Sequence, residues 1–100
     1  MTHKYALPIP PGADEAPADG SVLELARVWV SPGGPAITVR PAYDDPRAMG
    51  MMLAELCWNF AHAYEQKGGF TQRQALDALK QGWLDGHANG DAVEQQGTAQ

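Results

Sequence analysis

The sequence predicts a small α+β domain of order β-β-α-α. In it, an antiparallel β-hairpin packs on a long central helix and on a shorter, antiparallel C-terminal helix. Residues 44–67 carry one unbroken helical period, residues 22–40 hold two β-branched stretches around a Pro–Gly turn, and residues 71–86 carry a shorter helical period. The expected parts of the chain are an extended Pro-rich arm (1–21), a domain (22–86) and a flexible tail (87–100).

The central helix is predicted by apolar residues that recur at steps of three or four, the spacing of one helical face: Met49, Leu53, Leu56, Phe60 and Tyr64. Four smaller or more flexible residues widen this stripe: Met52, Cys57, Ala61 and Ala63. Asp44 or Asp45 can cap the N-terminus, and Pro46 suits the first helical position because that position needs no N–H donor. The following Gly–Gly pair ends a helix of about 22 residues.

The hairpin is predicted from residues 22–30 and 36–40, with the turn between them at Ser31–Pro35. Counting back from the turn pairs Trp29 with Ile37, Val28 with Thr38 and Arg27 with Val39. One face then presents Leu23, Leu25, Trp29, Ile37 and Val39, interrupted by Arg27, and the other presents Val22, Val28 and Val30 beside Glu24, Thr38 and Arg40. Because neither face is polar throughout, we expect covering layers on both sides.

The second helix is predicted to begin at Thr71, with Gln74 placed for a capping box. Its apolar stripe is Ala75, Leu76, Leu79 and Trp83, and it is expected to end near Asp85–Gly86. Residues 85–91 resemble the start of a calcium loop, but the third position is His87 and the twelfth is Gln96, so a tail is the better interpretation.

Composition excludes several classes of function. The formal charge is −5 and the seven Lys and Arg residues are scattered, which argues against a nucleic-acid or anionic-membrane surface. One cysteine allows no internal disulfide, and no apolar run approaches the ~20 residues of a membrane span. The N-terminus does not resemble a signal peptide, so we expect a cytoplasmic protein. No motif implies a cofactor, a metal site or a catalytic residue.

Six residues are candidates for an interface or ligand site: Arg27, Trp29, Glu55, Trp58, Asn59 and His62. Arg27 on a largely apolar strand face needs an acidic partner, for which Glu24, Asp44 and Asp45 are available. Glu55, Asn59, His62 and Gln66 share one helical face, which is either solvated or, doubled across an oligomer axis, a polar or metal site. Cys57 and His62 diverge by about 140° on a helix, which argues against a nucleophile–base pair.

The predicted elements do not cover one another. A lone two-stranded hairpin is marginal in water, and the second helix is too short to cover the central one. We therefore expect a homo-oligomer, most simply a dimer, that joins hairpins or pairs central helices. Gly50 inside the central helix costs helix stability unless another element packs closely there.

Two segments resemble a family of small bacterial proteins known as a domain of unknown function: LARVWVSPGGPAITVRP and YDDPRAMGMMLAELCWNFAHAYE. The shared pattern is a strand ending R-V-W-V, a Gly-containing turn, a short strand, and D-D-P opening a long helix. It covers about half to two-thirds of the chain. The resemblance implies a folded module and brings no activity or site residue with it.

Three functions remain open. The first is a cytoplasmic, non-enzymatic, self-associating module whose partner is itself or another protein. The second is a small-molecule or metal-binding protein, or an enzyme, with a site between subunits around Trp58, His62, Glu55 and Asn59. A polar cavity lined by those four side chains favours the second, and their full exposure favours the first. A third reading, an adaptor that lays a client on the hairpin edge, needs an unpaired strand.

Overall fold

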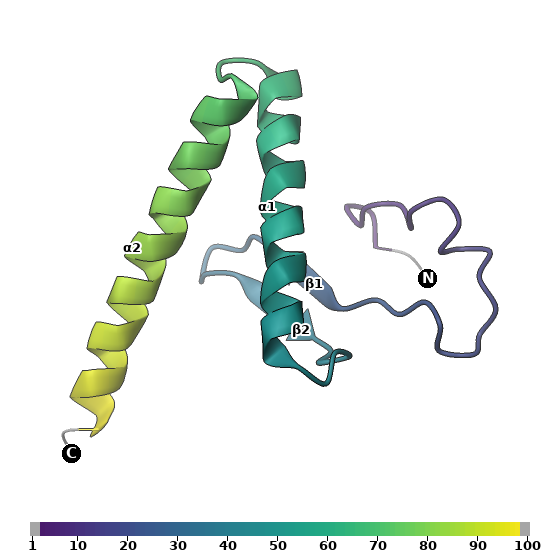
Figure 1. Cartoon of the computed structure of the whole chain (residues 1–100), viewed down its shortest axis with the longest axis horizontal. Coiled ribbons are helices and arrows are strands. Elements are labelled where there is room, and N and C mark those ends of the chain that lie inside the picture. The colour runs from purple at the N-terminus through teal and green to yellow at the C-terminus, as the bar shows by residue number, and fades with distance from the viewer. Residues whose placement is uncertain (1–2, 99–100) are drawn as a thin grey trace. The chain divides into compact units, whose positions relative to one another are not determined.

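The computed structural model describes residues 3–98, and the side chains of residues 3–91. The elements are β1 (Ala26–Trp29), β2 (Ala36–Val39), α1 (Pro46–Lys67) and α2 (Gln72–Thr98), shown in Figure 1. This order confirms the predicted α+β fold. The chain divides between Asp44 and Asp45 into two compact units, one with the hairpin and one with the two helices. Among the described residues, neither helix is long and apolar enough to cross a bilayer.

The N-terminal arm contains no helix or strand from residue 3 to residue 25. It contacts the hairpin through His3, whose ring packs edge-on against Trp29 with the centroids 4.7 Å apart. Leu7 in this arm is 88% exposed. Hydrogen bonds from the Ser21 side chain and backbone N–H hold the pKa of the Asp19 carboxyl below its usual value.

The hairpin is shorter than predicted and is shifted in register by one residue. The structure pairs Ala26 with Val39, Arg27 with Thr38, Val28 with Ile37 and Trp29 with Ala36. The predicted pairing of Trp29 with Ile37 is therefore wrong. Since side chains alternate along a strand, the shift moves Ile37 and Val39 to the face opposite Trp29.

The corrected register separates the two faces of the hairpin more cleanly than expected. One face is entirely aliphatic and consists of Ala26, Val28, Ile37 and Val39, which we call the aliphatic face. The other carries Arg27, Trp29 and Thr38. Arg27 donates from Nε to a Glu24 carboxylate oxygen at 2.8 Å, so Glu24 is its acidic partner among the three candidates. Both side chains are more than half exposed, and such a pair contributes at most about 1 kcal/mol.

Helix α1 begins and ends where its sequence predicts. The Asp45 side chain accepts a 3.0 Å hydrogen bond from the N–H of Arg47, so Asp45 rather than Asp44 is the N-cap. Pro46 occupies the first helical position. Gly68 follows the last turn with φ of 100°, a conformation that residues with a Cβ rarely adopt, and the helix stops there.

Helix α2 is longer than predicted. It has 27 residues against 22 in α1, and it continues past the expected end at Asp85–Gly86 to Thr98. A single glycine costs a helix only about 1 kcal/mol, and the residues beyond it include several good helix formers, so Gly86 does not end the helix. Residues 87–98 of the predicted tail are thus helical, and residues 99–100 lie outside the described residues. A continuous helix through residues 85–91 also leaves no calcium loop.

Candidate functional site

The two helices are joined by a short turn whose hydrogen bonds fix its geometry. Thr71 Oγ1 accepts from the N–H of Gln74 at 3.1 Å, and Gln74 Oε1 accepts from the N–H of Thr71 at 2.9 Å, which confirms the predicted capping box. The Glu65 carboxylate, near the end of α1, accepts from the N–H of Gln72 at 2.7 Å. A carboxylate is stabilised there because the first N–H groups of a helix are unpaired and carry the positive end of its dipole.

Beside this turn, α1 and α2 contact each other through a small apolar core. Ala61 has no accessible surface, and Ala75 and Leu76 are 4% and 1% exposed. Cys57 and Leu79 are partly buried against these three residues. The sequence analysis placed Cys57 among the residues that widen the apolar stripe of the central helix, and it packs against this core.

The contact between the helices uses the small side chains of α1 rather than its large ones. Two helices leaving a short turn must approach closely, and small side chains at the contact allow this. Three large residues of the predicted stripe remain about half exposed: Leu53 (48%), Leu56 (49%) and Phe60 (53%). The helical hairpin therefore leaves much of its apolar surface open.

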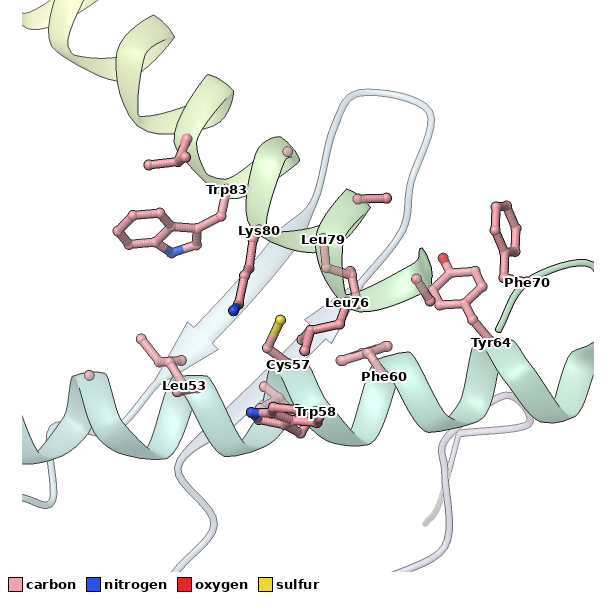
Figure 2. A pocket seen from close by; sticks show the side chains of 17 residues that line it. Leu53, Cys57, Trp58, Phe60, Tyr64, Phe70, Leu76, Leu79, Lys80 and Trp83 are labelled. Carbon is pink, nitrogen blue, oxygen red and sulfur yellow. The ribbon is translucent and has the colours of Figure 1, made fainter. Parts of the chain in front are cut away.

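From the turn the two helices diverge (Figure 1), and an apolar groove of about 1010 Å³ opens between them. Figure 2 shows Leu53 and Cys57 pointing into it from α1, and Leu76, Lys80 and Trp83 pointing into it from α2. At its narrow end the rings of Tyr64 and Phe70 pack edge to face, 6.2 Å between centroids. We call this feature the groove and define it by Leu53, Cys57, Tyr64, Leu76, Lys80 and Trp83.

The groove offers an apolar surface with few polar atoms. Of the described residues that line it, only Lys80 is charged. The other polar side-chain atoms are the Tyr64 hydroxyl, the Cys57 sulfur and the indole nitrogens of Trp58 and Trp83. Within the described part of the chain, no three His, Cys, Asp or Glu side chains are grouped so that they could hold a metal ion. Such a surface suits binding through burial of aromatic and aliphatic side chains.

The six predicted site residues are divided between the two units of the chain. Arg27 and Trp29 lie on the hairpin, where they are occupied by Glu24 and His3. Trp58 is 49% exposed and lines the groove.

The other three, Glu55, Asn59 and His62, lie on the exposed polar face of α1. Asn59 donates its amide to the Glu55 backbone carbonyl at 2.9 Å, so it bonds to its own helix. The three polar side chains do not line the groove.

Lys80, Trp83 and Leu84 are groove residues that the sequence analysis did not propose as a site. Trp83 was assigned to the predicted apolar stripe of the second helix, and Leu84 and Lys80 lie beside that stripe. Leu84 is 56% exposed and Trp83 is 60% exposed, which is high for side chains of this size and type. The sequence signal that could have found them was the occurrence of large apolar residues on two sides of the second helix.

Comparison with known proteins identifies the family of the chain. A family model described as "Domain of unknown function (DUF5076)" matches residues 6–89. The chain belongs to the DUF5076 family. The match extends beyond the two segments that carry the resemblance in the sequence, and it takes in both strands, all of α1 and the groove-lining part of α2. No curated protein matches the chain.

A solved structure supports the fold of this DUF5076 protein. It is described as "Structure of a putative pyruvate dehydrogenase from the photosynthetic bacterium Rhodopseudomonas palustrus CGA009". The two are 24% identical with a TM-score of 0.64, and the match covers 88% of this chain and 99% of that one. At this identity the likeness shows a shared fold alone.

Proposed function

We propose that this DUF5076 protein is a non-enzymatic, self-associating protein-interaction module of the cytoplasm. The observation that carries the proposal is the small size of the core between α1 and α2. Among the described side chains, the buried hydrophobic residues are Ala61, Ala75 and Leu76, and two of these are alanines. Burial of so little apolar surface cannot offset the conformational entropy lost by ordering two helices.

Glu55, Asn59 and His62 are exposed in the single chain, and Trp58, the fourth residue of the predicted site between subunits, is 49% exposed and lines the groove. The titratable groups that line the groove are Cys57, Tyr64 and Lys80, and nothing arranges them as a nucleophile with its base. The name of the structurally similar protein from Rhodopseudomonas adds no activity here, because a shared fold does not determine a function.

Small-molecule binding is a second candidate, which the volume of the groove favours. Ligand sites measure about 300–1,000 Å³ and combine apolar walls with a few polar groups. The groove, at about 1010 Å³ with Lys80 and Tyr64 on its walls, is at the upper end of that range. Native mass spectrometry of the protein purified from cells tests this candidate. A bound small molecule would support it, and a mass equal to protein alone would contradict it.

Self-association is tested by light scattering on a size-exclusion column over a dilution series. We expect a mass of twice the 10.7 kDa chain, retained on dilution to low micromolar concentration. A mass of 10.7 kDa at every concentration, with the helical signal of the folded chain, would overturn the proposal.

A further inference from the structure

We propose that the groove between α1 and α2 binds an amphipathic helix of another protein, one that carries an acidic side chain within its apolar face. The apolar residues of that helix would pack on the groove walls, and its carboxylate would pair with Lys80. The inference rests on the proposed role as a protein-interaction module and names the chemistry of the partner segment.

Lys80 is the reason for an acidic group on the partner. Of the described residues that line the groove, it alone is charged, and its side chain points into the groove (Figure 2). The ion pairs among the described residues join Arg27 to Glu24 and Arg73 to Asp77, so Lys80 has no carboxylate partner in this part of the chain. A partner that covers the groove removes water from the ammonium group, which is costly unless a carboxylate takes the place of that water.

The position of Lys80 along α2 indicates how the partner is patterned. Leu76 and Leu79 precede it toward the narrow end of the groove, and Trp83 and Leu84 follow it toward the open end. The cation thus lies between apolar residues, and a complementary segment must present its anion between apolar groups. An acidic residue three or four positions from apolar residues on one helical face has this pattern, whereas a fatty acid carries its anion at one end.

The walls of the groove favour a helical partner over an extended one. They offer few hydrogen-bond partners, because most of the lining residues are aliphatic or aromatic. An extended strand would leave backbone N–H and C=O groups unpaired on such a surface, whereas a helix pairs these groups within itself. An apolar helical face seated in an apolar groove is also a recurrent mode of peptide recognition.

The open part of the groove has the side chains and the length that such a helix needs. Leu53 on α1 is 48% exposed, and Trp83 and Leu84 on α2 are 60% and 56% exposed. Large side chains of this kind, tryptophan above all, are the usual anchors of an interface. The lining residues of α1 lie within residues 50–64, which span about 21 Å, the length of four turns of a partner helix.

A second copy of the chain does not supply the acidic group through this surface. In a two-fold contact the groove would meet the same groove of the other copy, whose one charged residue among those described is again a lysine. Glu55, an acidic residue in the middle of α1, does not line the groove. The charge of the groove is therefore complementary to a different chain.

The test uses three synthetic amphipathic peptides that differ at one position. Each is about 15 residues long, or four helical turns, with leucines on one face and lysines on the other. The central residue of the leucine face is glutamate, glutamine or lysine, and the affinity of each peptide for the full chain is measured by isothermal titration calorimetry. We expect the glutamate peptide to bind about tenfold more tightly than the glutamine peptide, and the lysine peptide to bind most weakly.

Variants of Lys80 test whether this residue reads the charge of the peptide. Lys80→Glu is expected to reverse the order of the three affinities, and Lys80→Gln to bring them within about threefold of one another. Lys80 is exposed and both replacements are good helix formers, so we expect unchanged helical circular dichroism.

Arg73→Glu is the matched control for the change of charge. It alters the net charge of the chain as much as Lys80→Glu does, and it lies on the same helix but does not line the groove. Its position in the first turn of α2 suits an acidic residue. We expect Arg73→Glu to leave the order of the three affinities unchanged.

Cys57 reports where the peptide binds, since it lines the groove and is the only cysteine of the chain. We expect its labelling by a thiol reagent to slow at least about tenfold when the glutamate peptide is far above its dissociation constant. An unchanged labelling rate with the peptide bound would place the peptide on another surface, such as the aliphatic face of the hairpin, and would overturn the proposal.

Three further results would overturn it: no peptide binding to the full chain, equal affinities of the three peptides for the wild type, or an order that Lys80→Glu leaves unchanged. Dodecanoate that protects Cys57 where the peptides do not would assign the groove to a small anionic ligand instead. Self-association is judged separately by light scattering. A dimer that binds no peptide overturns this inference alone, and a monomer that binds the glutamate peptide overturns self-association alone.

Discussion

Leu76 and Ala61 show how much of the helical hairpin depends on single side chains. Leu76 is the largest fully buried side chain among the described residues, and Ala61 beside it has no accessible surface. Ala61 stabilises the contact by being small, since a larger residue there would hold the helices apart. Leu76 stabilises it by filling the space that remains. The two positions need side chains of opposite size, so we expect an exchange of their residues to destabilise the contact.

Replacement of Leu76 by alanine is expected to destabilise the protein by about 2–5 kcal/mol, because it removes buried methyl groups and leaves a cavity. Leu7→Ala is the matched control, since Leu7 is 88% exposed and its loss is expected to change stability by no more than about 0.5 kcal/mol. Urea unfolding followed by helical circular dichroism measures both variants. Equal unfolding midpoints for the two would show that Leu76 is not part of a core.

At the scale of elements, the N-cap of α1 is a position for which the sequence offers two candidates and the structure selects one. Asp44 and Asp45 are both able to cap, but only the Asp45 carboxylate is shown accepting the N–H of Arg47. We expect Asp45→Ala to cost about 1 kcal/mol of unfolding free energy and Asp44→Ala no more than a few tenths. Denaturant unfolding measures both, and a larger loss for Asp44→Ala would contradict the assignment.

The hairpin and α2 show where local patterns were insufficient. The turn at Ser31–Gly34, closed by a 3.0 Å hydrogen bond from the Gly34 N–H to the Ser31 carbonyl, sets the register by backbone geometry. A count of residues cannot determine this geometry, and a shift of one residue exchanges the faces. The end of α2 was misplaced because Asp85–Gly86 resembles a stop signal, and whether a glycine ends a helix depends on the residues that follow it.

For the whole molecule, the proposed dimer predicts that thermal stability depends on protein concentration. If folding and association are one process, mass action favours the folded dimer as concentration rises. For two chains of this size we expect the unfolding midpoint to rise by roughly 3–4 °C per tenfold increase in concentration. Calorimetry at three concentrations measures the shift. An unchanged midpoint would mean that the single chain is stable by itself.

The sequence by itself determined the class of the fold, the order of its elements, the limits of α1 and the capping box of α2. These features follow from hydrogen bonding and side-chain periodicity within a few residues, and such short-range interactions can be read along the chain. It also indicated that apolar surface would be left uncovered.

Only the tertiary structure decided which side of α1 meets α2, and therefore that a groove exists. The periodicity of α1 is centred on its large residues, yet contact occurs at Cys57 and Ala61 because a short turn brings the helices too close for larger side chains. Trp58 was the one predicted site residue that this arrangement brought to the groove. Lys80 and Trp83 joined it because packing between helices depends on their relative angle, which no local pattern specifies.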